Sequence, residues 1–269
     1  MKKIFVILVL IASNITAQEH EAHNFVCPPC DAACDTRTFE KAGKCDVCNM
    51  DLITKEKREH DMAEAFKDKK KIAFYLQEGV EVLDFAGPME VFSYAGYEVF
   101  TVSKTKAPIR SQGILKVIPD YSIADAPKSD ILAFFGGNAD NAYRDEKVID
   151  WVKSRTDVDY YFSVCTGAFV LAEAGILNGH TATTFHGALS DFENRYPNVN
   201  VKRNVRFVDN GTVITTAGVS AGIDGALHMV AKFEGLEKAK EVAFYMEYDK
   251  WKPGEGLLLT ADNPYEKKQ

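Results

Sequence analysis

The residue whose type and position best suit covalent chemistry is Cys165. It directly follows the apolar run over 160–164, which predicts a buried strand, and a helix-forming segment begins with Thr166-Gly167. A cysteine at such a turn has its sulfur near the unbonded N–H groups of the helix, which favour the thiolate. Nucleophile elbows expose their nucleophile at turns of this kind. A core cysteine is the alternative, but the strand–Cys–Thr–Gly–helix pattern favours a nucleophile.

Two further segments lead to the same edge of the predicted sheet. Asp84 lies shortly after the first predicted strand, and Gly136-Gly137 follow another. Because ligands of doubly wound sheets bind at the carboxyl ends of the strands, we expect these residues near Cys165. A carboxyl group beside a thiolate can exchange a proton with it, and backbone N–H groups at Gly136-Gly137 and Thr166 can hold a developing anion. The sequence therefore predicts a thiol site at this edge.

Strands and helices alternate from residue 71 onward, and this alternation predicts the fold that positions the thiol. The predicted strands are 72–76, 97–102, 114–118, 131–135, 160–164, 205–208 and 213–216. The predicted helices are 88–94, 147–154, the segment after Cys165, 221–233 and 236–248. Pro88 is expected to open its helix and Gly96 to end it, and capping of that helix is the alternative role for Asp84. Asn210-Gly211 predicts a hairpin. The fold class is α/β, a mostly parallel sheet between two layers of helices.

The start of the chain carries a second group of cysteines, five of the six within 22 residues. Cys27-Pro28-Pro29-Cys30 and Cys45-Asp46-Val47-Cys48 are two C-x-x-C pairs separated by 14 residues. Two such pairs bind one tetrahedral ion, so residues 24–53 predict a site for zinc or another soft metal. The predicted ligands are Cys27, Cys30, Cys45 and Cys48, with Cys34 as a spare thiol. Disulfides are the alternative, since an exported protein meets an oxidising compartment.

The first 17 residues are typical of a secretory signal peptide. Lys2 and Lys3 precede an apolar run over 4–12, and cleavage is expected after Ala17. The run is too short to span a bilayer, so we expect a periplasmic or secreted protein without a stable membrane anchor. The formal net charge is -7, and removal of the two lysines makes it -9. A chain this acidic, without a basic stripe, is not expected to bind nucleic acid.

The part of the chain over 71–250 lies between a charged segment over 54–70, predicted to be a linker or an exposed helix, and a C-terminal tail over 251–269. It contains the motifs Leu83-Asp84-Phe85-Ala86-Gly87-Pro88, Ser163-Val164-Cys165-Thr166-Gly167-Ala168, Ala182-Thr183-Thr184 and residues 217–224. Together these motifs resemble the DJ-1/PfpI superfamily, and within it the isocyanide hydratase-like branch. The resemblance implies a flavodoxin-like three-layer sandwich, often dimeric, with Cys165 as nucleophile. It also implies that Asp84 is the acid/base partner of the thiol and that Thr166 lines the site.

Two features of the chain bear on these resemblances. Many relatives have a histidine after the paired threonines, where this chain has Phe185; the adjacent His186 is the candidate for a Cys–His arrangement. The Cys-rich segment resembles the heavy-metal-binding module of metal-efflux proteins, most clearly over 45–52. There Asn49 stands in the place of the usual glycine.

Three functions are consistent with these expectations. In the first, the thiolate of Cys165 attacks an isocyanide, Asp84 exchanges a proton, and water releases an N-substituted formamide. In the second, the same thiolate forms a hemithioacetal with an α-oxoaldehyde, as in a glyoxalase-type reaction. In the third, the protein is a non-enzymatic metal or redox sensor in which Cys165 is oxidised. A small-molecule substrate and a homodimer are expected, and no cofactor is expected at the thiol. A regulator's sensing domain is disfavoured by the leader and by the lack of a helix-turn-helix pattern.

Overall fold

The computed structural model describes residues 25–28, 33–34, 36–66, 69–261 and 263–265. For residues 62–66 it describes the backbone alone. Contacts within the chain divide it into two compact units, Met1–Ala65 and Phe66–Gln269. The predicted leader over 1–17 and the predicted ligand Cys30 lie outside the described residues. Among the helices that are described, none has the length and apolarity needed to cross a membrane.

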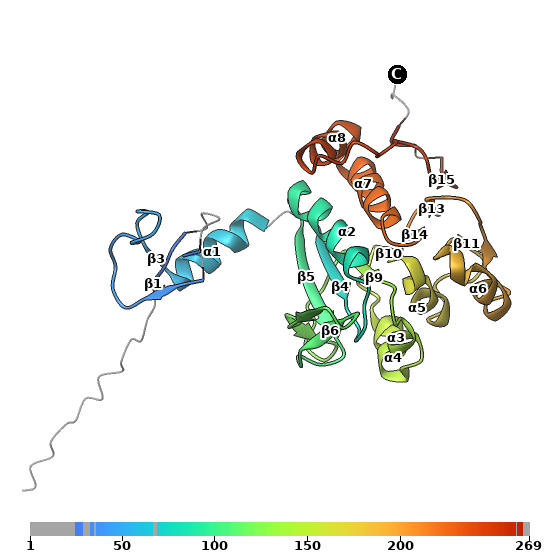
Figure 1. Ribbon diagram of the computed structural model, residues 1–269, viewed down its shortest axis with the longest axis horizontal. Helices are drawn as coiled ribbons and strands as arrows, with labels where there is room; N and C mark the ends of the chain where they lie inside the picture. Colours follow the sequence, from blue (N-terminus) through green and yellow to red (C-terminus); the bar gives the residue numbers. More distant parts are fainter. Residues whose placement is uncertain (1–24, 29–32, 35, 67–68, 262, 266–269) are drawn as a thin grey trace, which may run out of the picture. The chain divides into compact units, whose positions relative to one another are not determined.

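In its described part, the larger unit is built on an eight-stranded sheet with the order β15-β13-β14-β10-β9-β4-β5-β8 (Figure 1). These strands are β4 (Lys71–Tyr75), β5 (Glu98–Ser103), β8 (Tyr121–Ser122), β9 (Ile131–Phe134), β10 (Tyr160–Val164), β13 (Phe207–Asp209), β14 (Val213–Thr216) and β15 (Leu257–Leu258). Neighbouring strands run parallel except for β13 and β14, which are antiparallel. The carboxyl ends of β4, β9 and β10 therefore meet at one edge.

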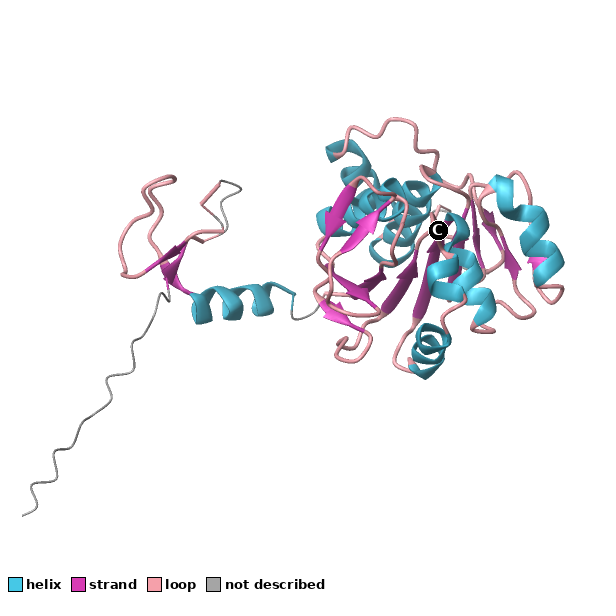
Figure 2. Ribbon diagram, turned by 60° about the horizontal axis from the view of Figure 1, so that its bottom comes forward, coloured by secondary structure: helices cyan, strands magenta, loops and turns pink. Residues whose placement is uncertain are grey.

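Helices cover both faces of this sheet (Figure 2). One layer consists of α2 (Val82–Ala95), α7 (Ala221–Glu234) and α8 (Leu236–Tyr245), and the other of α3 (Asp140–Tyr143), α4 (Glu146–Ser154), α5 (Ala168–Glu173) and α6 (Leu189–Arg195). In β4, Ile72 and Phe74 pack into the first layer, while Ala73 and Tyr75 pack into the second. Burial on both faces explains why the strands are continuous apolar runs. The predicted flavodoxin-like α/β sandwich is confirmed.

Helix α2 differs from the prediction in its first residue. It begins at Val82, and Pro88 lies inside it; only the predicted end, at Gly96 in a left-handed conformation, is confirmed. Pro88 lacks the N–H that would bond to the carbonyl four residues earlier, but the helix continues through it. Asp84 consequently lies in the first turn of α2 instead of ahead of the helix. The capping alternative for Asp84 is wrong, because its oxygens bind N–H groups outside α2.

Short strands account for most of the remaining differences. The hairpin at Asn210-Gly211 is confirmed by the antiparallel pair β13–β14. The predicted strand over 114–118 is one arm of a small hairpin, β6 (Ile109–Ser111) with β7 (Leu115–Val117). Two-residue strands are too short to show alternation, and β8, β11 (Thr181–Ala182), β12 (Asn200–Val201) and β15 escaped prediction for this reason.

The smaller unit has a three-stranded antiparallel sheet in its described residues, ordered β2-β1-β3. Its elements are β1 (Phe25–Val26), β2 (Thr38–Phe39), β3 (Ile53–Thr54) and α1 (Lys55–Phe66). Its core is formed by the buried Cys27, Cys34 and Cys45, with Phe39, Cys48 and Leu52 packed around them. So small a core needs support from a bound metal or a covalent link.

Candidate thiol site and metal centre

The backbone of Cys165 is held in an uncommon conformation directly after β10. The residue opens a short 3-10 turn (Cys165–Gly167) with φ of 59°, in the left-handed region that non-glycine residues rarely adopt. Its N–H donates to the carbonyl of Ala217 at 3.1 Å, and its carbonyl accepts the hydroxyl of the buried Thr184 at 2.6 Å. Such a conformation costs about 1–3 kcal/mol and persists only where its surroundings hold it. The two hydrogen bonds supply that restraint.

Asp84 reaches the thiol from α2 and is completely buried. Its Oδ2 accepts the N–H of Gly136 at 2.8 Å, after β9, and its Oδ1 accepts the N–H of Val219 at 3.1 Å, after β14. A further hydrogen bond joins the carboxyl group to the Cys165 thiol. The structure therefore brings together the predicted nucleophile and its predicted acid/base partner, at the edge where β9 and β10 end.

The glycine pair allows this close approach. A Cβ atom on Gly136 would lie 2.6 Å from the Cys165 sulfur and 2.8 Å from Asp84 Oδ2, so only a hydrogen fits between them. Gly137 has φ of 82°, and a Cβ there would lie 2.3 Å from the carbonyl oxygen of Gly79. Because the N–H of Gly136 is bound to Asp84, the N–H groups that face the sulfur are those of Gly137 and Thr166.

Burial dominates the electrostatics of the pair. It raises the pKa of Asp84 to about 7, and the charge of Glu81 adds to this rise, although the N–H of Gly136 opposes it. Burial also raises the pKa of the Cys165 thiol to about 12, followed by the charge of Asp84, although the N–H groups of Thr166 and Gly137 oppose the rise. The expectation that the turn alone favours a thiolate is thus wrong: desolvation outweighs the N–H groups.

The two groups therefore act as a unit that retains one proton over a wide pH range. When that proton is on Asp84, the negative charge that raises the pKa of Cys165 is gone, and the carboxyl group can donate a hydrogen bond to the sulfur anion. A thiolate is then formed by transfer of the thiol proton to Asp84. The arrangement can deliver a sulfur nucleophile and return the same proton to a substrate.

The other predicted residues have distinct places. Thr166 is half-buried, and its hydroxyl donates to the Gly137 carbonyl at 3.4 Å, which links the two loops of the site. His186 is exposed in a 3-10 turn (His186–Ala188), and its ring lies 4.2 Å from that of Phe185. Phe185 packs closely against Gly218, where a Cβ would lie 2.5 Å from its ring. This geometry gives the Cys–His alternative no support.

Sequence reasoning missed three residues that hold the site in place. Thr184 belongs to a motif of the family resemblance, but its bond to Cys165 was not predicted. Val219 has φ of 53°, which is rare for a β-branched residue, and nothing in its local sequence indicates this. Gln77 follows β4 and is buried, and a glutamine after an apolar strand was the available signal.

Replacing Gly136 with alanine should test the close packing of the site. The added methyl group would overlap both the sulfur and the Asp84 carboxylate, and a displacement of about 1 Å at a reacting pair costs on the order of a hundredfold in rate. We expect iodoacetamide to label Cys165 about a hundredfold more slowly in Gly136→Ala, measured by peptide mass mapping, with the melting temperature as the control for folding. A wild-type labelling rate in Gly136→Ala would contradict the close packing of Gly136 against Cys165 and Asp84.

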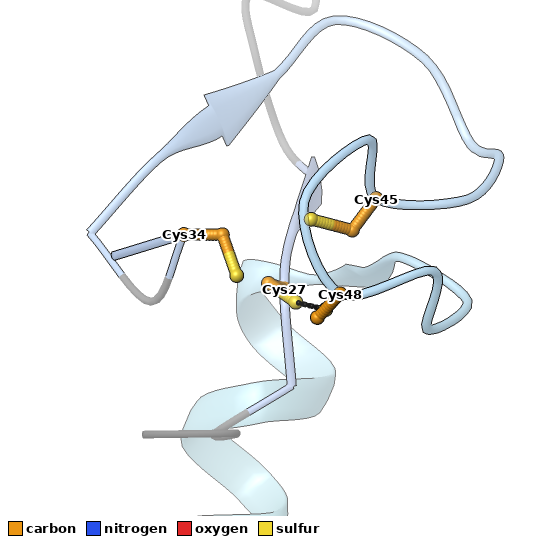
Figure 3. A group of neighbouring side chains, drawn as sticks. All are labelled: Cys27, Cys34, Cys45 and Cys48. Carbon is orange, nitrogen blue, oxygen red and sulfur yellow. Dashed lines mark hydrogen bonds between the residues drawn. The ribbon is translucent and has the colours of Figure 1, made fainter. Parts of the chain in front are cut away.

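The smaller unit brings four thiols together (Figure 3). The sulfur atoms of Cys27, Cys34, Cys45 and Cys48 all lie within 4.8 Å of one another. Four thiolates around one zinc ion lie about 3.8 Å apart, so the group is near the size that such an ion requires. The Cys27 and Cys48 sulfurs are 3.1 Å apart, longer than the ~2.05 Å of a disulfide bond. The donor set suits a soft metal ion.

The pKa of one thiol of the group, Cys48, is lowered by its neighbours. The hydrogen bond from Cys27, followed by the N–H of Met50, lowers the pKa of Cys48 to about 6. Both hydrogen bonds favour the thiolate form of Cys48, which is the form that binds a metal ion. Cys34, expected to be a spare thiol, is one of the four, and it is buried in the core of this unit. The predicted ligands Cys27, Cys45 and Cys48 are in the group, and Cys30 lies outside the described residues.

Comparison with known proteins identifies relatives for both units. Residues 24–55 match the heavy metal binding domain, and residues 70–232 match the DJ-1/PfpI family. The chain is 34% identical over 180 residues to isonitrile hydratase of Pseudomonas putida, covering 66% of this chain and 78% of that protein. It is also 28% identical over 178 residues to the HTH-type transcriptional regulator CdhR of Pseudomonas aeruginosa, covering 63% of this chain and 52% of the regulator.

Solved structures agree with this assignment. A THiJ/PfpI family protein from Pseudomonas syringae superposes with a TM-score of 0.62 at 29% identity, covering 69% of this chain and 77% of that one. DJ-1beta of Drosophila melanogaster shares the fold, with a TM-score of 0.60 at 22% identity over 66% of this chain and 98% of that one. With a family match over more than half of its length and a Cys–Asp pair at the carboxyl edge of the parallel strands, the chain belongs to the DJ-1/PfpI family.

Proposed function

We propose that the larger unit is a Cys-dependent enzyme that hydrates isonitriles to N-substituted formamides. The observation that carries the proposal is the buried Cys165–Asp84 pair, in a chain 34% identical to an isonitrile hydratase over 78% of that protein. An isonitrile has an electrophilic terminal carbon whose lone pair must be protonated. The pair offers a sulfur nucleophile and one proton at the same place, which is what this substrate needs.

The reaction follows from these two groups. The Cys165 thiol gives its proton to Asp84, and the sulfur attacks the terminal carbon of R–NC while Asp84 protonates that carbon, giving the thioimidate R–N=CH–S–Cys. Water adds to this carbon, its protons pass to the nitrogen and to Asp84, and the C–S bond breaks. The products are R–NH–CHO and the thiolate, which recovers its proton from Asp84. The N–H groups of Gly137 and Thr166 face the sulfur and stabilise its charge as it leaves.

Turnover of cyclohexyl isocyanide tests the proposal directly. Formation of N-cyclohexylformamide, followed by NMR, is expected with the wild-type protein and is expected to fall by at least about a thousandfold in Cys165→Ser, because the hydroxyl is a far weaker nucleophile than the thiolate. Methylglyoxal is the comparison substrate. Conversion of methylglyoxal without formamide production would favour the glyoxalase-type alternative, and equal turnover by Cys165→Ser would remove the thiol from the mechanism.

A second candidate function is ligand sensing, because the chain is also similar to transcription regulators over a comparable length. A sensor binds its ligand without consuming it. Calorimetric binding of an isonitrile to the wild-type protein, without formamide production, would favour this alternative. A redox sensor would instead show peroxide-dependent oxidation of Cys165, detected by peptide mass mapping, without turnover of either substrate.

For the smaller unit we propose a bound soft metal ion, held by cysteine thiolates. The match to the heavy metal binding domain and the four clustered thiols support it. Zinc is the ion whose tetrahedral thiolate preference fits best, and other soft ions share that preference. Bound metal would fix the strands of a unit whose core consists largely of cysteines.

Export and assembly are further proposals. The lysines and apolar run at the start support cleavage after Ala17 and a periplasmic or secreted location. The mass of the mature protein, recovered from the periplasmic fraction, tests this: a chain that begins at Gln18 is expected. A homodimer, with no nucleic acid partner, is proposed from the family, and light scattering of the purified protein measures its mass.

A further inference from the structure

A single buried side chain holds two consecutive peptide groups of the thiol site. Nε2 of Gln77 donates to the carbonyl of Phe135 and to the carbonyl of Gly136, both at 3.0 Å. Gln77 follows β4, is 3% exposed and lies beside the end of β9. A buried amide is costly unless its hydrogen bonds are made, and these bonds go to the two carbonyls that precede the N–H groups of the glycine pair.

The planarity of the peptide bond connects Gln77 to the reacting groups. In a trans peptide the carbonyl and the N–H point to opposite sides. The peptide that carries the Phe135 carbonyl has the N–H of Gly136, which donates to Asp84 Oδ2 at 2.8 Å. The next peptide carries the Gly136 carbonyl and the N–H of Gly137, which faces the Cys165 sulfur. Gln77 thus binds the carbonyl side of both peptides, and Asp84 and Cys165 face the N–H side.

Because Gly136 and Gly137 have a flexible backbone, their peptides need a restraint from outside. Gly136 must be glycine because a Cβ would overlap the sulfur and the carboxylate, and Gly137 has φ of 82°. Both residues are therefore in the most flexible type of backbone. The N–H of Glu81 also donates to the Gly136 carbonyl, at 3.1 Å, so one of the two peptides has a second restraint. For the Phe135 carbonyl, Gln77 is the side chain that fixes its direction.

We propose that Gln77 is a positioning residue of the thiol site: its amide orients the two glycine peptides so that their N–H groups point at Asp84 and Cys165. The proposal goes beyond the general role of a glycine pair, because it assigns the direction of both donors to one side chain in the segment that follows β4. It rests on the proposed function only where turnover is the readout.

Gln77→Met tests the proposal, because methionine has a similar length and fills the buried space without donors. Without the amide of Gln77, the N–H groups of the glycine pair would stabilise the Asp84 carboxylate and the Cys165 thiolate less. The pH midpoint of Cys165 labelling by iodoacetamide should therefore move upward. The labelling rate at pH 7 should fall about tenfold. In turnover assays kcat should fall while KM changes little, since the substrate's own contacts remain. Gln77→Asn, one methylene shorter, reaches one carbonyl at most and should give an intermediate shift.

Controls separate positioning from stability. Val148→Ala removes a buried side chain from α4, on the opposite face of the sheet. It should lower the melting temperature without moving the pH midpoint of labelling. A wild-type midpoint in both Gln77 variants, or the same shift in Val148→Ala, would overturn the proposal. Labelling needs no substrate, so a failure of isonitrile turnover with a shifted midpoint would contradict the proposed function and leave the role of Gln77 supported.

Discussion

Replacing Asp84 with asparagine is expected to lower kcat/KM for an isonitrile by about a thousandfold. Asparagine keeps the size of the side chain but cannot hold the proton that the thiol must give up, and general acid–base groups contribute about 10²–10⁴-fold. It also offers one acceptor oxygen where the carboxylate accepts N–H groups from Gly136 and Val219 on two oxygens. Steady-state kinetics with cyclohexyl isocyanide measure the effect.

The pH dependence distinguishes a proton carrier from a merely structural carboxyl. Burial raises the pKa of Asp84 to about 7, so in the wild type we expect labelling of Cys165 to show an inflection near pH 7, which Asp84→Asn should lose.

The raised pKa of Asp84 also has a consequence for the stability of the fold. Between about pH 4 and 7 a carboxyl whose pKa is raised on folding binds a proton in the folded state but not in the unfolded state. Its contribution to the free energy of unfolding is therefore full below pH 4 and is lost as the pH rises through 7. The wild-type free energy of unfolding should therefore fall over that interval by a few kcal/mol, on the order of 1.4 kcal/mol per unit of pKa, more than it does in Asp84→Asn. Denaturant titrations at pH 4 and 8 measure it. An unchanged inflection in Asp84→Asn would exclude Asp84 as the proton carrier.

The sequence predicted the larger unit where local patterns are strong. The apolar runs of β4, β9 and β10 are long enough to be recognised, and the last two lead into Gly136 and Cys165 at their carboxyl ends. Cys165 and Asp84 come from segments far apart in the chain, but parallel strands carry both to one edge, so their proximity followed from the fold class. The start of α2 was misplaced because Pro88 is a strong local signal, whereas the helix is held by packing over its whole length.

What the sequence did not reveal depends on contacts between distant segments. The protonation of Cys165 is set by burial and by the charge of Asp84, and a turn pattern shows only the N–H groups that oppose them. The bonds from Thr184 and Gln77 join the site to distant segments, and no local pattern in those segments indicates these contacts. In the smaller unit, the two C-x-x-C pairs were the obvious ligands. No local pattern indicates that Cys34 lies beside the other three thiols: it is outside both C-x-x-C pairs, and the two-residue strands β1 and β2 are too short to show a periodicity.

Removal of the metal from the smaller unit is expected to unfold it. The protein purified without chelator should contain about one soft metal ion per chain, and a strong chelator should then expose the backbone amides of residues 25–54 to hydrogen exchange. The reason is that, in the part of this unit that the structure describes, the buried cluster consists of three cysteines, which leave little apolar surface to hold β1, β2 and β3 together without the ion. Exchange measured on the full chain by mass spectrometry compares both units, and the larger unit should stay protected.

Single substitutions assign the ligands. Cys34→Ser should weaken metal binding by at least about a hundredfold, because the buried site loses one of four thiolates. Cys165→Ser is the matched control, since it removes a thiol of the other unit and should leave the metal content unchanged. Wild-type affinity in Cys34→Ser would exclude Cys34 as a ligand and turn attention to the remaining cysteines. A metal-free protein whose thiols are found paired would instead favour disulfides, because each cysteine would then be bonded to another instead of sharing one ion.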